Sequence, residues 1–268
     1  MKKILVTGMA PVAMLLFSSL AFAQADKLYV LDCGWSHNAD ESRWTPGLHV
    51  GEPIDMSENC FLIHDKQGYF LWDTGYPDAV AAMPDGQVSG PTTVRRNRTL
   101  AAQLQELGVK PSDILYVGIS HTHPDHTGNI DQFPDSTIVI SKAEFDATQK
   151  SQRPAFPATH KVMLLEADKD IFGDGAITVL QTPGHTVGHQ SLLVHLPKSG
   201  WIILTGDAVH LKENWEARRV PGMNADKEKT LTSMQKLADL QAQHNAQLWI
   251  NHDKPQSDAL LHSPKFYE

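Results

Sequence analysis

The sequence predicts a mixed α/β fold in which β-sheets are covered by helices. Apolar runs rich in Val, Ile and aromatic residues predict strands in both halves of the chain. Amphipathic stretches predict helices over 99–108 and 224–243, so strands and helices alternate from about residue 99 onward. This pattern fits either one mixed sheet or two packed sheets, and both arrangements stay open at this point.

The N-terminal part of the predicted domain is rich in strands. A first strand is expected over 27–35, and 60–75 reads as a hairpin of two β-rich runs around a polar turn that ends in Gly68. The polar stretch 36–58 between them is predicted to be a long loop. A second long loop is predicted over 76–96, which contains glycine and proline breaks.

The remaining elements follow from periodicity. In the helix at 99–108, Leu100, Leu104 and Leu107 share one face and Gly108 is suited to the C-cap. Leu231, Met234, Leu237 and Leu240 likewise lie on one side of the helix at 224–243. Further strands are predicted over 113–120, 136–141, 161–165, 176–185, 191–208 (two strands) and 247–253, with a short helix over 142–149.

The first 23 residues have the pattern of a secretory signal peptide. Lys2 and Lys3 precede an apolar stretch, and Ala21 and Ala23 provide small residues at the positions that determine cleavage. Cleavage after Ala25 and a buried N-terminal helix are the alternatives. We therefore expect a periplasmic or secreted protein, with residues 24–268 forming a single domain of 245 residues.

The charge balance excludes some classes of partner. The formal net charge of −8 would become −10 without the two lysines of the signal peptide. An acidic chain is not expected to bind nucleic acid or an anionic membrane, although Arg95, Arg96 and Arg98 form a short basic patch. No other stretch is long and apolar enough to cross a bilayer.

The two cysteines, Cys33 and Cys60, are both expected to remain after cleavage. An even cysteine count in an exported chain favours a disulfide between them. The alternative is two small buried apolar side chains.

The motif HTHPDH at 121–126 follows the apolar strand at 113–120. On an extended strand end, His121 and His123 point the same way, while Asp125 and His126 follow a proline where the chain must turn. Imidazole and carboxylate groups are zinc ligands. One short loop thus offers two pairs of ligands, which suits two adjacent metal ions better than one.

Three more candidate ligands follow apolar strands elsewhere in the chain. His185 lies in TPGH, Asp207 in TGDA and His252 in INHD. A carboxylate with two oxygens, such as that of Asp207, can bridge two metal ions.

HTHPDH, TPGHTVGH, TGDA, His252 and the WDTG stretch at 72–75 together resemble the ordered motifs of the metallo-β-lactamase superfamily. The resemblance implies an α/β fold of the αββα sandwich type, with two packed mixed sheets flanked by helices. It also implies two zinc ions per chain, with another divalent metal as the alternative. It assigns His121, His123 and His185 to one zinc and Asp125, His126 and His252 to the second, with Asp207 between them.

Within this superfamily, the stretch 97–129 and the KENWE run at 212–216 resemble N-acyl-homoserine lactone lactonases. Such enzymes typically carry a tyrosine three residues after the bridging aspartate, where this chain has His210. They also tend to have Gly-Gly where this chain has Gly128-Asn129. The resemblance implies a quorum-quenching hydrolase, in which a dizinc-bound hydroxide opens the lactone ring, His210 assists and Asp125 transfers a proton. Relatives include dimers, so a homodimer is also left open.

Other functions stay open at this stage. An exported zinc β-lactamase fits the signal peptide but generally lacks an aspartate like Asp207, and a thioesterase of this fold would need a longer C-terminal region. A non-enzymatic zinc-binding protein would have no open metal position. His189 and Asp73 are candidates for orienting ligands by hydrogen bonds. Apolar side chains that could hold an acyl chain are Trp35, Trp44, Met56 and Trp215.

Overall fold

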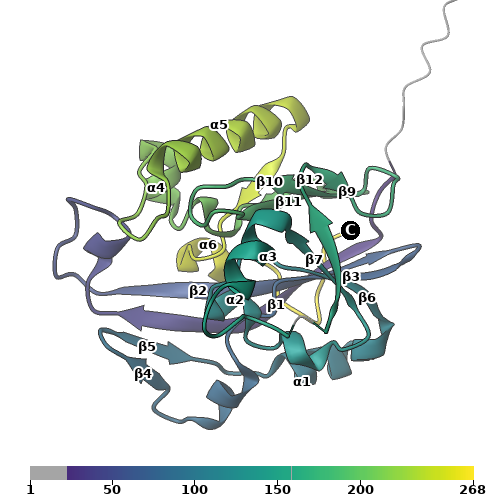
Figure 1. Cartoon of the computed structure of the whole chain (residues 1–268), viewed down its shortest axis with the longest axis horizontal. Coiled ribbons are helices and arrows are strands. Elements are labelled where there is room, and N and C mark those ends of the chain that lie inside the picture. Colours follow the sequence, from purple (N-terminus) through teal and green to yellow (C-terminus); the bar gives the residue numbers. More distant parts are fainter. Residues whose placement is uncertain (1–22, 158) are drawn as a thin grey trace, which may run out of the picture.

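The computed structural model describes residues 23–157 and 159–268, which form two β-sheets packed face to face (Figure 1). The predicted signal peptide lies outside the described residues, apart from Ala23. The question that the sequence left open, one sheet or two, is therefore answered in favour of two.

The larger sheet has eight strands and the smaller has five. The larger runs in the order β4 (Gln87–Ser89), β5 (Thr92–Arg95), β1 (Lys27–Asn38), β2 (Ile54–Asp65), β3 (Gly68–Trp72), β6 (Ile114–Gly118), β7 (Thr137–Ser141) and β8 (Lys161–Leu165). Its pairings are antiparallel up to β3 and parallel from β3 to β8. The smaller runs β13 (Gln247–Trp249), β12 (Gly200–Leu204), β11 (Gln190–Leu196), β10 (Ile177–Gln181) and β9 (Lys169–Asp170), and only β12–β13 is parallel.

Helices cover the outer faces of both sheets (Figure 1). Side chains of α1 (Leu100–Glu106) and α3 (Lys142–Gln149) pack on the larger sheet, and those of α4 (Lys212–Ala217) and α5 (Lys227–His244) pack on the smaller. Of two short helices, α2 (Pro124–Thr127) contains the candidate ligands Asp125 and His126, and α6 (Lys254–Asp258) begins two residues after His252. Five 3-10 segments complete the described elements: Glu41–Arg43, Asp78–Ala82, Pro111–Asp113, Ile130–Gln132 and Gly206–Ala208. The predicted αββα sandwich is confirmed.

The main core lies between the two sheets, because the strands of both present apolar side chains to each other. Phe61, Phe70 and Trp72 of the larger sheet pack in one buried cluster with Val179 and Leu192 of the smaller. Burial of apolar surface contributes about 25 cal/mol per Å², so this layer is a dominant stabilising feature. It fixes the strand ends from which the candidate ligands extend.

Both predicted long loops are wrong in their extent. β1 continues to Asn38 and β2 begins at Ile54, with these two residues paired, so the loop covers only 39–53. Ser36, Asn38 and Ser57 are polar but buried, which made this stretch look like a solvated loop. The stretch 76–96 contains the β4–β5 hairpin, in which β5 pairs with the end of β1.

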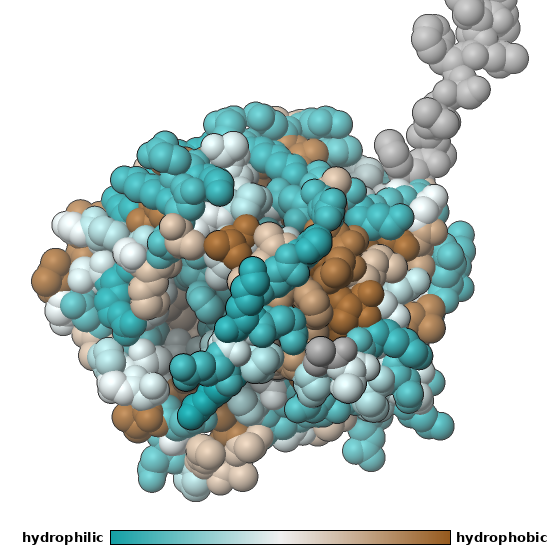
Figure 2. Space-filling model, viewed as in Figure 1, coloured by the Kyte–Doolittle hydropathy of each residue, from teal (hydrophilic) through white to brown (hydrophobic). Residues whose placement is uncertain are grey.

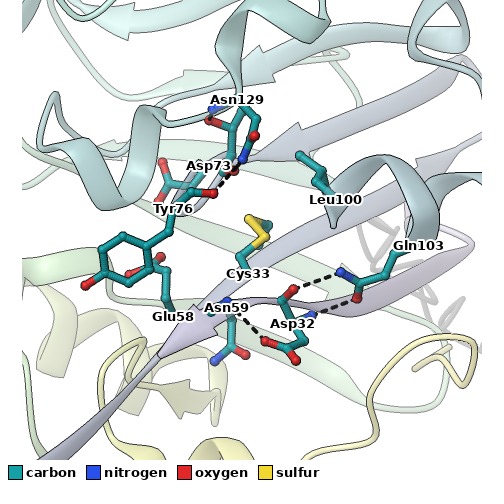
Figure 3. The surroundings of a disulfide bond; sticks show 12 residues. Asp32, Cys33, Glu58, Asn59, Asp73, Tyr76, Leu100, Gln103 and Asn129 are labelled. Carbon is teal, nitrogen blue, oxygen red and sulfur yellow. Dashed lines mark hydrogen bonds between the residues drawn. A yellow bond between two sulfur atoms is a disulfide. The ribbon is translucent and has the colours of Figure 1, made fainter. Parts of the chain in front are cut away.

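The predicted disulfide between Cys33 and Cys60 is present and joins β1 to β2 (Figure 3). It lies beside an irregularity in β1, where the pairing register shifts between Asp32 and Trp35. Gly75 packs directly against it: an added Cβ there would lie 2.3 Å from the Cβ of Cys33, and the backbone has a φ of +70°. The disulfide is therefore in contact with the last residue of the WDTG motif.

The face drawn in Figure 2 is mostly hydrophilic, with hydrophobic residues in patches between polar ones. In the described part of the chain, no helix is both long and apolar enough to span a bilayer.

Candidate metal centre

The HTHPDH loop leaves the end of β6 and is held by the loop that follows β3. Asp73, which has a φ of +58°, accepts a hydrogen bond from the backbone N–H of Ser120 (2.7 Å) and another from Nδ1 of His126 (2.9 Å). The backbone N–H of Thr74 donates to the carbonyl of His126 (2.8 Å). A carboxylate on the far nitrogen of a histidine fixes its ring and leaves Nε2 free to bind a metal. Asp73 thus orients the signature loop, one of the two roles that the sequence left open for it.

Three of the predicted histidines converge in a first group. Nε2 of His121 lies 2.8 Å from Nδ1 of His123, which lies 3.1 Å from Nε2 of His185. His121 and His185 are buried, and His123 is exposed. His185 reaches this position from the turn after β10. Burial lowers the pKa of His121 and of His185 well below the ordinary value, so both imidazoles are neutral, the form that binds metal.

Asp207 lies between this group and a second one. Its Oδ2 is 3.3 Å from Nε2 of His185, while its Oδ1 is 3.3 Å from Nε2 of His126 and 3.1 Å from Nε2 of His252. The backbone N–H of Asp207 donates to Nε2 of His189 (2.8 Å). His189 thus positions Asp207 by a hydrogen bond, as the sequence suggested. Nε2 of His252 is also 3.2 Å from Oδ2, so this one carboxylate lies within 3.3 Å of histidines from both groups, as a ligand shared between two ions would.

The second group contains the other predicted residues, Asp125, His126 and His252, and one that the sequence did not indicate, Glu58. His252 follows β13, and its Nδ1 donates to the carbonyl of Ser57 in β2 (2.8 Å). Asp125 is the most solvent-accessible of the predicted carboxylates, with 22 % of its side chain exposed against 3 % for Asp207. The structure therefore brings all seven predicted ligands together in two adjoining groups.

Glu58 was missed because it stands in the polar stretch SEN, which reads as a loop. In the structure it belongs to β2, its side chain is fully buried, and Oε1 accepts a hydrogen bond from Nδ2 of Asn251 (2.7 Å). Burial raises its pKa to about 8. Residues 56–63 of β2 are all buried, so no alternation of polar and apolar residues marked this glutamate as buried.

The second group carries an excess of negative charge. Burial acts to lower the pKa of His126, but the neighbouring carboxylates, above all Glu58 and Asp207, outweigh it and raise the pKa well above its usual value. Burial is likewise outweighed at His252, where Asp207 and Glu58 raise the pKa to about 10. Carboxylates that keep buried imidazoles protonated also favour a metal cation in place of those protons.

Unpaired buried atoms test whether a metal fits here. Nε2 of His126 and Oδ1 of Asp207 are both buried and make no hydrogen bond within the described part of the chain. An unpaired buried polar atom costs free energy comparable to a lost hydrogen bond. The two atoms lie 3.3 Å from each other, and both are of types that bind zinc. The residues present therefore fit a metal centre.

His210 lies beside Asp207 and is buried. Its Nε2 is 3.2 Å from Oδ2 of Asp207, and burial lowers its pKa, so the ring is neutral. The predicted role, a donor to a substrate carbonyl, stays a prediction. A neutral imidazole has one N–H, so Nε2 of His210 can donate either to Asp207 or to a substrate oxygen, but not to both at once.

A cavity of about 140 Å³ opens onto the centre. It is lined by the exposed edge of both ligand groups, by His210, and by side chains of the strands and loops around them. The lining residues other than the ligands are Ser36, Asn38, Arg43, Trp44, Met56, Tyr76, Thr92, His210 and Met223. Of the four apolar residues suggested for an acyl chain, Trp44 and Met56 line this cavity. Trp35 lines a separate pocket, and Trp215 packs against the smaller sheet and its helices.

A larger cavity of about 550 Å³ adjoins the first, and the two share His123, His185 and Met223.

Fold and site together define a hydrolase-type αββα sandwich with a paired His/Asp centre at one edge. The model of the metallo-beta-lactamase superfamily matches residues 53–243. The chain belongs to this superfamily.

Comparisons with individual proteins show which members of the superfamily this chain is similar to. The N-acyl homoserine lactonase AttM of Azorhizobium caulinodans is 34% identical over 240 residues, which cover 81% of this chain and 90% of that protein. An N-acyl homoserine lactonase of a Bacillus species is 31% identical over 254 residues, covering 90% and 98% of the two chains.

Among solved structures, a quorum-quenching N-acyl homoserine lactone hydrolase has a TM-score of 0.81 at 26% identity, covering 92% of this chain and all of that one. A second, with N-hexanoyl-L-homoserine bound at its catalytic metal centre, has a TM-score of 0.80 at 26% identity, covering 91% of this chain and all of that one.

Proposed function

We propose that this protein is a metal-dependent hydrolase that opens the lactone ring of N-acyl-homoserine lactones. One observation carries the proposal: seven candidate ligands from four separate segments converge in two groups around Asp207, at the wall of a cavity. The relatives named as N-acyl homoserine lactonases, which align along most of the chain, support the choice of substrate.

In this proposal His121, His123 and His185 hold one zinc ion, and Asp125, His126 and His252 hold a second, with Asp207 between them. Nitrogen and carboxylate donors suit zinc, which has little geometric preference of its own. When bound, two such ions supply an activated water and stabilise negative charge on the reacting oxygens.

The reaction adds one water to the ester. A bond forms between the water oxygen and the carbonyl carbon, the ring C–O bond breaks, and an N-acyl-homoserine is released with a proton from its new carboxylic acid. Asp125, the most exposed carboxylate of the centre, is placed to carry a proton to the leaving alkoxide. His210 borders the same cavity and is placed to hold the substrate carbonyl through a hydrogen bond.

The test is proton release by the purified protein mixed with a long-chain N-acyl-homoserine lactone, with mass spectrometry of the product. The measurement is made before and after removal of metal by a chelator, and again after zinc is restored. Metal-dependent appearance of the ring-opened product supports the proposal. Fully metallated protein that leaves the lactone intact would refute it, and a β-lactam and a thioester run in parallel would then identify the other reactions open to this centre.

We further propose that the protein is exported to the periplasm or secreted, and the homodimer that the sequence analysis left open stays a prediction. The signal-peptide pattern at 1–23 and the Cys33–Cys60 disulfide support export, because disulfides persist in oxidising compartments. Fractionation of the producing cell with N-terminal sequencing of the mature chain tests the proposal. Light scattering of the purified protein tests the prediction.

A further inference from the structure

We infer that Glu58 is a positioning residue for the second metal ion. It favours the binding of that ion from the side of the two histidine ligands that faces away from Asp207. The inference rests on the metal centre of the proposed function and adds to it a residue outside the seven predicted ligands. It does not depend on the identity of the substrate.

The first step is the location of the Glu58 carboxylate. Oε1 lies 3.7 Å from Nδ1 of His126, and Oε2 lies 3.5 Å from Nδ1 of His252. These nitrogens are on the far side of each ring from Asp207, which faces both Nε2 atoms. Glu58 is thus the one residue of the second group that faces both imidazoles from the side opposite Asp207.

The second step is that other groups already fix the two rings. Nδ1 of His126 donates to Asp73, and Nδ1 of His252 donates to the carbonyl of Ser57. Glu58 is therefore not needed to orient them by hydrogen bonds. Its contribution is the negative charge that it carries when a cation is bound beside the two rings, because in a buried site such a charge acts through a low effective dielectric.

The third step is the cost of burying that charge. Oε2 of Glu58 is buried and has no hydrogen-bond partner within the described residues, while Oε1 accepts one bond, from Asn251. A buried carboxylate with so few donors is unfavourable unless opposite charge lies close to it. Together with Asp73, Asp125 and Asp207 it makes four carboxylates, whose formal charge equals that of two divalent cations. Glu58 completes this balance.

The segment that carries Glu58 is also tied to the segment that carries His252. Oγ of Ser57 donates to the carbonyl of Asn251 (2.7 Å), and the backbone N–H of Asn59 donates to Oδ1 of Asn251 (3.0 Å). The side chain of Asn251 then donates to Glu58 itself (2.7 Å). This clamp holds the carboxylate at a fixed distance from His252, so a change of charge at Glu58 need not move the backbone.

The experiment compares Glu58→Gln with the wild-type protein. Glutamine keeps the shape and an oxygen acceptor for Asn251 but removes the charge. Two quantities are measured on each purified protein: zinc bound per chain across a series of chelator-buffered zinc concentrations, and the melting temperature of the metal-free form. Glu144→Gln is the matched control, because Glu144 is a similarly buried carboxylate that instead accepts hydrogen bonds from Thr122 and Gly188, beside the first group.

We expect Glu58→Gln to weaken binding of one zinc ion by about ten- to a hundred-fold, the usual effect of an outer-shell change, and to leave the other unchanged. The metal-free form should melt at the same or a higher temperature, since a buried carboxyl group with one hydrogen bond has been replaced by an amide of the same shape. Glu144→Gln should leave the affinity at the second group as in the wild type.

Two results would overturn the inference. One is wild-type affinity for both ions in Glu58→Gln. The other is loss of both ions together with a lower melting temperature of the metal-free form, which would mean that Glu58 is only structural. A wild-type protein that binds two zinc ions but opens no lactone would refute the proposed function and leave this inference standing.

Discussion

Loss of the Cys33–Cys60 disulfide should destabilise the protein by an amount that the structure allows us to estimate. The bond closes a segment with a sequence separation of 27 residues. In the chain-entropy model, a cross-link across such a loop lowers the entropy of the unfolded chain enough to stabilise the fold by about 3.5 kcal/mol at 25 °C. Both cysteines are fully buried, and Gly75 packs against them, so the native state gives the sulfur atoms little room to separate.

The assay is urea unfolding followed by fluorescence, with and without a phosphine reductant, at one fixed free zinc concentration. Fixed zinc matters because bound metal adds its own stabilisation. The Cys33→Ala, Cys60→Ala double variant is the control. It should match the reduced protein to within about 1 kcal/mol, allowing for the packing lost with two small side chains, and it should not respond to reductant. Equal unfolding free energies of the oxidised and reduced proteins would refute the reasoning.

Four further predictions concern the site. Asp207→Asn should lower zinc affinity by more than about 100-fold and abolish hydrolysis, measured by metal analysis and proton release, because the central carboxylate faces both groups. His210→Ala should lower kcat by about 100-fold with zinc content unchanged, as expected for loss of one donor to the reacting oxygen, and an equal loss of zinc would instead make it a ligand. Zinc binding to the metal-free protein should release protons and weaken as the pH falls, since the pKa of His252 is about 10 without metal; calorimetry in two buffers of different ionisation enthalpy measures this. Met223→Ala should raise the preference for longer acyl chains by about tenfold in kcat/KM, because Met223 lines both cavities, and unchanged ratios across a chain-length series would contradict this.

The elements that position the ligands were largely predictable from the sequence. Apolar runs such as 113–120 and 247–253 correctly indicated strands, which the structure places at the shorter spans Ile114–Gly118 and Gln247–Trp249. The predicted helix at 142–149 and strand at 161–165 have the same bounds in the structure. Since each candidate ligand directly follows such a run, its place at a strand end could be inferred without knowing how the sheets pack.

The errors have a common physical cause at the edge where the site lies. The stretch 36–58 was predicted to be a loop because it contains Ser36, Asn38, Ser57 and Glu58, and a polar run usually indicates solvated chain. All four are buried in β1 or β2. Their burial is possible because Asn38 and Ser57 find hydrogen-bond partners and because, in the proposed centre, metal ions would offset the charge of Glu58.

The same reasoning explains why HTHPDH was informative while SEN was not. Histidines and aspartates clustered within six residues are unusual in any role other than metal binding, so their chemistry is visible in one segment. The effect of Glu58 depends on two rings delivered by other strands, His126 after β6 and His252 after β13, and no local pattern contains that juxtaposition. A buried carboxylate in a strand is costly unless a partner of opposite charge is near. When the fold becomes known, such a residue therefore points to a cation that the sequence alone could not associate with it.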